Sequence, residues 1–178
     1  MGVSMNLPNK LSIFRVILVP FFMFFIICPV LGDIGSRIVA ALIFIIASVT
    51  DMIDGKIARK YGLITDFGKF IDPLADKFLV FGALISMLYK YDYLKGLVIA
   101  ATVVFFRELA VTSMRLLVVN NSGKVIAASW LGKVKTVTQI ICISTILLEP
   151  VVFSKVDFIM NTHLLSYITM AAMTVMTL

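Results

Sequence analysis

Six stretches of about 20 mainly apolar residues divide the chain, and each is long enough for a helix to cross a lipid bilayer. Their approximate bounds are 11–31, 36–59, 68–89, 94–119, 130–150 and 158–178. The chain is 61% hydrophobic and 15% charged, whereas a soluble domain is roughly half apolar and a quarter charged. A spanning segment must satisfy its backbone hydrogen bonds internally. The sequence therefore predicts an all-α, polytopic membrane protein with six transmembrane helices in a single domain over residues 1–178.

Lys and Arg residues are divided unevenly between the two ends of these spans. With the N-terminus placed in the cytoplasm, twelve of the 16 lie on the cytoplasmic side, and Arg37, Lys90, Lys95 and Lys155 lie on the other. Cytoplasmic loops carry an excess of Lys and Arg, so we expect the N-terminus to be cytoplasmic. The net charge of +6 sits at segment ends, where it suits topology and anionic lipid or phosphate. This placement argues against a nucleic-acid partner.

One charged stretch, residues 51–77, interrupts the apolar pattern with the sequence DMIDGKIARKYGLITDFGKFIDPLADK. It is flanked by residues 38–50 and 78–89, which contain no charged side chain. Four of its five carboxylates therefore lie where two apolar segments end and begin, on the predicted cytoplasmic side: Asp51, Asp54, Asp72 and Asp76. Carboxylates in membrane segments are costly and rare, which makes this stretch a functional-site hypothesis.

Helical spacing arranges these carboxylates in two pairs. Residues three and four apart share a helix face, so Asp51 and Asp54 stack on the second span, and Asp72 and Asp76 stack on the third. The connection over about 60–67 is short, so the two helices are expected to be antiparallel neighbours. Gly55 on the first pair's face leaves room either for a ligand or for close helix packing.

Four clustered carboxylates repel one another and need neighbouring cations or divalent metal ions. A ligand set made only of oxygen atoms suits hard ions, namely Mg²⁺, Mn²⁺ or Ca²⁺. Two such ions could clamp a phosphoryl group and its leaving oxygen, and one carboxylate could act as a general base. Arg59 could hold phosphate or simply mark the cytoplasmic end of the span.

A second polar group lies downstream. Arg107 and Glu108 interrupt the fourth span, and Arg115 follows about two helical turns later on the same face as Arg107. Lys133 and Lys135 open the fifth span. These four cations suit a second anionic ligand such as a phosphate, with Glu108 orienting an Arg. The alternative is that they only determine topology.

The start of the first span carries polar residues at a spacing of three: Asn9, Ser12 and Arg15. They could present one polar helix face. They could equally belong to a capped and anchored helix start.

The charged stretch also resembles a family signature. Its fixed positions are Asp51-x-x-Asp54-Gly55-x-x-Ala58-Arg59 and, after eight residues, Gly68-x-x-x-Asp72-x-x-x-Asp76. This is similar to the CDP-alcohol phosphotransferase pattern at every defined residue. Further segments, including LPNKLSIFRVILVPFF, RELAVTSMRLL and AASWLGKVKT, resemble the bacterial phosphatidylglycerophosphate synthase branch, so the likeness covers nearly the whole chain.

The resemblance implies six transmembrane helices, a homodimer in the bacterial inner membrane, and a metal-dependent site open to the cytoplasm. It implies transfer of the phosphatidyl group of CDP-diacylglycerol to sn-glycerol 3-phosphate. By resemblance, two divalent cations, Mg²⁺ or Mn²⁺, are held by Asp51, Asp54, Asp72 and Asp76, with Asp76 also as the general base. The CDP-lipid would be bound at Gly55, Ala58, Arg59 and Gly68. The acceptor phosphate would be bound at Arg107, Arg115, Lys133 and Lys135.

Three other interpretations are weighed against this one. Within the family, the acceptor could be serine, an inositol phosphate or phosphatidylglycerol, although the downstream cations favour a phosphorylated acceptor. A divalent-cation transporter would also place carboxylates in the membrane, but it would want acidic groups along a path across the bilayer, and the outward halves hold almost none. A purely structural membrane subunit leaves the four aspartates unexplained.

Overall fold

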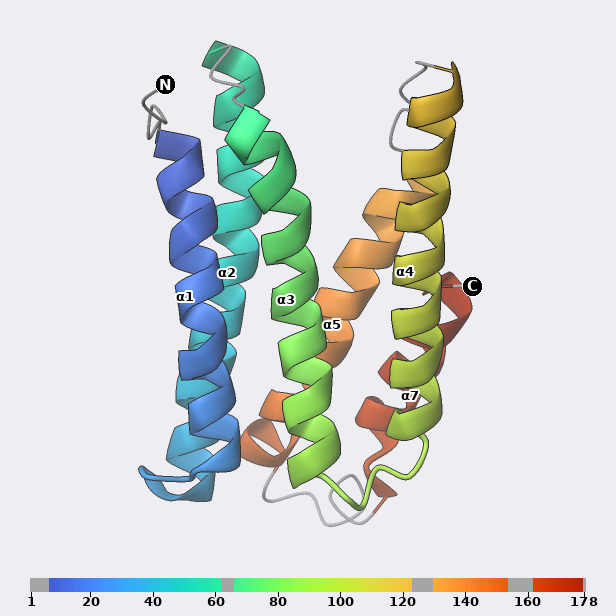
Figure 1. The fold of residues 1–178 in the computed structure, drawn as a ribbon. Coiled ribbons are helices and arrows are strands. Elements are labelled where there is room, and N and C mark those ends of the chain that lie inside the picture. Colours follow the sequence, from blue (N-terminus) through green and yellow to red (C-terminus); the bar gives the residue numbers. More distant parts are fainter. Residues whose placement is uncertain (1–6, 62–65, 123–129, 154–161, 178) are drawn as a thin grey trace. The chain divides into compact units, whose positions relative to one another are not determined.

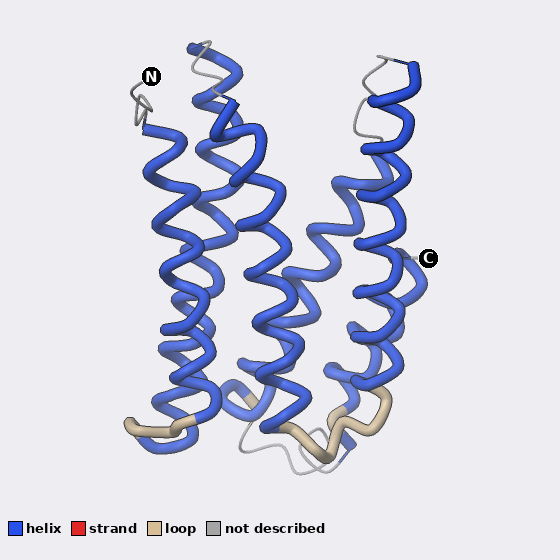
Figure 2. Tube along the Cα trace, viewed as in Figure 1, coloured by secondary structure: helices blue, strands red, loops and turns tan. Residues whose placement is uncertain are grey.

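The computed structural model describes residues 7–61, 66–122, 130–153 and 162–177, and all regular secondary structure in these ranges is helical (Figure 1 and Figure 2). The helices are α1 (Leu7–Ile27), α2 (Gly32–Tyr61), α3 (Asp66–Lys90), α4 (Leu97–Ser122), α5 (Trp130–Val152) and α7 (Leu164–Thr177). The prediction of an all-α chain is confirmed.

Four of these helices are long and apolar enough to cross a membrane. Their spans are Asn9–Ile27 in α1, Gly32–Asp51 in α2, Leu97–Met114 in α4 and Val134–Val152 in α5. The third helix is long enough, but it carries the charges in the second half of the 51–77 stretch, and α7 has 14 residues. The chain is thus a membrane protein by the character of its helices, and membrane crossings by α3 and α7 stay predictions.

The chain packs as two compact units, Met1–Lys90 and Tyr91–Leu178. The first contains α1, α2 and α3, and the second contains α4, α5 and α7. A single domain over residues 1–178 stays a prediction.

In the first unit, α1 packs along both α2 and α3 (Figure 1). On the α2 side, the fully buried rings of Phe22 and Phe44 lie with their centroids 5.6 Å apart. On the α3 side, a Cβ atom added to Gly82 would lie 2.8 Å from Cγ1 of Val19. Glycine here lets the two helices approach closely, as small residues do in membrane-helix interfaces. α1 is therefore held between two partners along its length.

The turn between α1 and α2 is stabilised by local contacts. Gly32 begins α2 with φ +76°, a backbone conformation that glycine adopts without strain. The hydroxyl of Ser36 accepts a hydrogen bond from the Leu31 N–H at 3.2 Å. Arg37 Nε donates to Asp33 Oδ2 at 2.9 Å, one helical turn away. This end of α2 is remote along the helix from the 51–77 stretch.

In the second unit, α7 packs against both α5 and α4. Glu149 of α5 is 2% exposed and accepts hydrogen bonds from the Leu165 N–H, at 3.1 Å, and from the Ser166 hydroxyl. His163 precedes α7 with φ +47°, and its ring stacks on Tyr93 with centroids 4.2 Å apart. The start of α7 is thus fixed by a carboxylate of the neighbouring helix.

Candidate functional site

The first half of the charged stretch lies on α2, which continues as one helix to Tyr61, ten residues beyond the apolar span that ends at Asp51. Asp51 therefore marks the end of the apolar span. Asp54, Gly55, Ala58 and Arg59 follow in the same helix. Because α2 is continuous here, the three- and four-residue spacing of Asp51, Asp54, Gly55 and Ala58 places these four positions on one face. The side chains of Asp54, Ala58 and Arg59 lie outside the described part of the structure.

The second half lies in the first three turns of α3. Gly68, Asp72 and Asp76 follow one another at intervals of four residues, so all three lie on one face of this helix. Gly68 is buried, whereas Asp72 and Asp76 are half-buried. The predicted placement of the two carboxylate pairs on two successive helices is confirmed.

Two polar residues of α1 contact carboxylates from both halves of the charged stretch. An Nη1 atom of Arg15 lies 2.6 Å from Oδ1 of Asp51, which is a close ion pair. The Ser12 hydroxyl donates to Oδ1 of Asp72 at 2.5 Å. Ser12 and Arg15 lie about one helical turn apart on α1, so their partners Asp72 and Asp51 lie near one another. One helix therefore brings one carboxylate of each predicted pair, Asp51 and Asp72, into one cluster.

The carboxylates offer oxygen donors of the kind that hard divalent cations prefer. Asp51 and Asp72 each have one oxygen engaged by α1, and a carboxylate has a second oxygen that can bind a cation. Among the side chains that the structure describes, no group of three or more His, Cys, Asp or Glu residues has a metal-binding arrangement. Asp54 is outside that set. The donor chemistry of Asp51 and Asp72 fits a divalent cation.

Two of the four downstream cations, Arg107 and Lys135, lie beside Glu108 of α4. Lys135 of α5 forms an ion pair with Glu108 Oε1, and an Nη1 atom of Arg107 lies 3.8 Å from the same oxygen. Lys135 is 8% exposed, so this ion pair offsets the cost of burying its ammonium group. The structure thus brings Arg107 and Lys135 together around Glu108. Arg115 lies in α4 and Lys133 in α5, and their side chains are outside the description.

Sequence reasoning did not assign Ser12 and Arg15 to the site. Their spacing with Asn9 indicated a polar face, and the structure buries that face, with Asn9 1% exposed and the other two fully buried. The signal that could have found them is a polar stripe within an otherwise apolar span, since such groups need polar partners. The idea that Glu108 orients an Arg understated its role, because its closest partner is Lys135.

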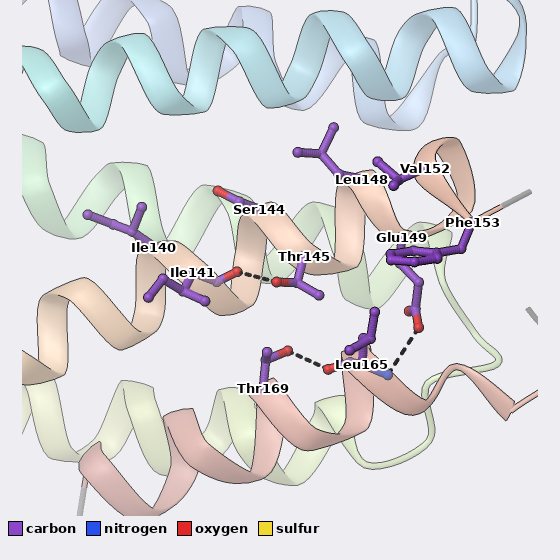
Figure 3. Close-up of a pocket in the computed structure, with 10 residues that line it drawn as sticks. All are labelled: Ile140, Ile141, Ser144, Thr145, Leu148, Glu149, Val152, Phe153, Leu165 and Thr169. Atoms are coloured by element: carbon purple, nitrogen blue, oxygen red, sulfur yellow. Dashed lines mark hydrogen bonds between the residues drawn. The ribbon is translucent and has the colours of Figure 1, made fainter. Parts of the chain in front are cut away.

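A separate cleft of about 400 Å³ lies between α5 and α7 (Figure 3). Ten residues line it, most of them apolar, with Glu149 near one end and Ser144, Thr145 and Thr169 along its length. None of the predicted site residues lines this cleft. Its surface suits hydrocarbon better than a charged nucleotide.

Comparison with known proteins is consistent with the geometry. The family model described as CDP-alcohol phosphatidyltransferase matches residues 5–178. The CDP-diacylglycerol–glycerol-3-phosphate 3-phosphatidyltransferase of Bacillus subtilis (strain 168) is 44% identical, over 86% of this chain and 82% of that protein. The enzyme of the same name from Escherichia coli (strain K12) is 39% identical, over 82% of this chain and 78% of that protein.

Proposed function

The chain belongs to the CDP-alcohol phosphatidyltransferase family, and on that premise we propose that it transfers the phosphatidyl group of CDP-diacylglycerol to sn-glycerol 3-phosphate. The products are phosphatidylglycerophosphate and CMP. This assignment rests on one observation. Asp51, from the first half of the signature, and Asp72, from the second half, are both held by α1 at the end of an apolar span. Such a site can hold a charged pyrophosphate while the attached acyl chains stay in lipid.

In this proposal Asp51, Asp54, Asp72 and Asp76 hold two divalent cations, either Mg²⁺ or Mn²⁺. Bound cations would neutralise negative charge on the donor pyrophosphate and on the departing CMP. Asp51 and Asp72 contribute carboxylate oxygens whose orientation is already constrained by α1. The cation requirement follows from charge, because four carboxylates and a pyrophosphate repel one another without it.

The reaction exchanges one phosphorus–oxygen bond for another. The acceptor hydroxyl oxygen attacks the phosphorus that carries diacylglycerol, and the bond from that phosphorus to the CMP oxygen breaks. The proton of the attacking hydroxyl passes to Asp76, which we assign as the general base. Asp76 is half-buried and lies one helical turn beyond Asp72 on the same face of α3. It can therefore belong to the carboxylate site and accept a proton there.

Four positions of the signature are assigned to the donor. Gly55 and Ala58 lack bulk on the carboxylate face of α2 and would admit the cytidine nucleotide, with Arg59 near its phosphates. Gly68, which is buried on α3, would allow close approach from the other helix. The acyl chains would remain between helices in the bilayer.

The acceptor phosphate is assigned to Arg107, Arg115, Lys133 and Lys135. The described part of this group, Arg107 and Lys135 around Glu108, presents two cations against one carboxylate. A local excess of positive charge suits a phosphorylated acceptor better than serine. This observation favours glycerol 3-phosphate, the acceptor in the names of both relatives.

The distribution of Lys and Arg supports a cytoplasmic N-terminus and a site that opens to the cytoplasm. We place the protein in the bacterial inner membrane as a homodimer. The lipid donor would reach the site from the bilayer, and the soluble acceptor would reach it from the cytoplasm.

Purified protein in detergent, supplied with Mg²⁺ or Mn²⁺, should release CMP from CDP-diacylglycerol only when glycerol 3-phosphate is present. Serine and inositol phosphate are the comparison acceptors. Equal turnover with either one would reject the acceptor assignment and keep the reaction class.

Asp51→Asn should abolish CMP release. Asp33→Asn is the matched control, since Asp33 lies on the same helix but pairs only with Arg37 among the contacts described, near the other end. Full activity in the Asp51 variant would remove this carboxylate from the site.

A further inference from the structure

The first helix contributes a buried polar face to a membrane-spanning segment. Asn9, Ser12 and Arg15 lie at three-residue intervals, and none is more than 1% exposed. A fully buried guanidinium within an apolar span is strongly destabilising unless it is paired. The burial of Arg15 is therefore tied to the partner that it meets on α2.

The burial on the two sides of this ion pair is unequal. The Arg15 side chain is fully buried, whereas the side chain of its partner Asp51 is 36% exposed. Ser12 is likewise fully buried, and its partner Asp72 is half-buried. In both pairs the α1 residue lies behind the carboxylate, and the carboxylate keeps an accessible part. This is the arrangement of a supporting contact behind a ligand-binding group.

The two contacts also tie both carboxylates to neighbouring positions on one helix. Ser12 and Arg15 are three residues apart, so they are separated by about 4.5 Å along the helix axis. Each engages one Oδ1 atom, on α3 and α2 respectively. Two like charges that repel one another are thus tied to fixed points on one helix.

We propose that Ser12 and Arg15 are positioning residues that fix the orientation and separation of Asp51 and Asp72 for divalent cations. The inference deepens the proposed function and rests on it. A residue that only anchors α1 to its neighbours would affect stability without changing cation affinity. Cation affinity measured without substrate is therefore the decisive quantity.

The experiment measures Mn²⁺ binding to the purified full-length protein in detergent by electron paramagnetic resonance, with thermal unfolding alongside. Ser12→Ala and Arg15→Lys should each weaken Mn²⁺ binding by about 10–100-fold, the usual effect of losing a contact behind a metal ligand. Arg15→Lys keeps the charge, so a change reports the lost guanidinium geometry. Ser12→Thr keeps the hydroxyl and should bind Mn²⁺ much as the unaltered protein does.

Two variants serve as matched controls. Ser86→Ala removes a fully buried hydroxyl on α3 that donates only to its own helix, at Gly82 O, among the contacts described. Arg37→Lys alters a buried arginine that pairs with Asp33 rather than with the cluster. Neither should change Mn²⁺ affinity.

The outcomes separate the inference from the proposed function. If the unaltered protein binds Mn²⁺ and the Ser12 and Arg15 variants bind it equally well, the positioning role is overturned and the metal centre stands. If the unaltered protein binds no Mn²⁺, the metal centre and this inference fall together. A Ser12→Thr protein as weak as Ser12→Ala would overturn the role of the hydroxyl.

Discussion

Glu108 of α4 and Lys135 of α5 form an ion pair that is almost fully buried, with side-chain exposures of 13% and 10%. The pair links two helices within the second unit and also fixes a cation that we assign to the acceptor phosphate. Removing one partner of a buried pair leaves an uncompensated charge, which is strongly destabilising. Stability and acceptor binding should therefore both depend on Glu108.

We predict that Glu108→Gln lowers stability by roughly 3 kcal/mol, the lower end of the range for breaking a buried pair. The double variant Glu108→Gln with Lys135→Met should recover much of that loss, because no buried charge is left alone. Thermal unfolding of the four proteins forms a double-mutant cycle. Strictly additive effects would show that the two side chains do not interact energetically.

A second prediction concerns the close approach of α1 and α3. Gly82→Ala would bring a methyl group within 2.8 Å of Cγ1 of Val19, a stiff branched side chain, and should destabilise the protein by about 1–3 kcal/mol. Val19→Ala should rescue it by removing the clashing atom. Gly96→Ala is the control, since its nearest atom at the same distance is the flexible end of Met170. Equal losses of melting temperature at both glycines would contradict this account.

The sequence predicted where the carboxylates lie better than what holds them. Asp51 and Asp72 could be placed on successive helices because residue spacing and apolar run length determine helical position. The partners Arg15 and Ser12 could not be identified, since a pairing across helices depends on how each helix is rotated about its axis. The periodicity of α1 indicated a polar face but not which neighbouring helices that face contacts.

The last span shows the same limit. Apolar character predicted a span from about residue 158, and its first residues, 158–161, lie outside the described structure. Within the described residues, α7 begins at Leu164. The start of α7 coincides with hydrogen bonds from Leu165 and Ser166 to Glu149 of α5. A carboxylate sixteen residues upstream cannot be recognised as a helix cap from local sequence signals.

That cap leads to a third prediction. Glu149→Ala should destabilise the protein by about 1–3 kcal/mol, because the Leu165 N–H and the Ser166 hydroxyl lose their acceptor in a buried place. Glu149→Gln keeps an acceptor oxygen and should lose less. The measurement is thermal unfolding in detergent, with hydrogen exchange at the start of α7 as the local readout. Unchanged exchange there in Glu149→Ala would contradict the capping role.

The fourth prediction tests the acceptor assignment. Arg107 is partly exposed, at 28% of its side chain, and its nearest described carboxylate, Glu108, is also the partner of Lys135. Arg107 can therefore offer hydrogen bonds to a phosphate. Arg107→Ala should raise the KM for glycerol 3-phosphate by about 10–100-fold, which corresponds to losing one hydrogen bond to a charged group. The KM for CDP-diacylglycerol should stay the same.

Arg37→Ala is the control for that measurement. It removes an arginine that pairs with Asp33 near the start of α2, far along that helix from the signature residues. It should leave both KM values unchanged. Steady-state CMP release, with each substrate varied in turn, distinguishes the two sites because only the acceptor phosphate is assigned to Arg107. A parallel rise in both KM values would mean that Arg107 supports the protein as a whole. A rise for the lipid donor alone would move Arg107 from the acceptor site to the donor site.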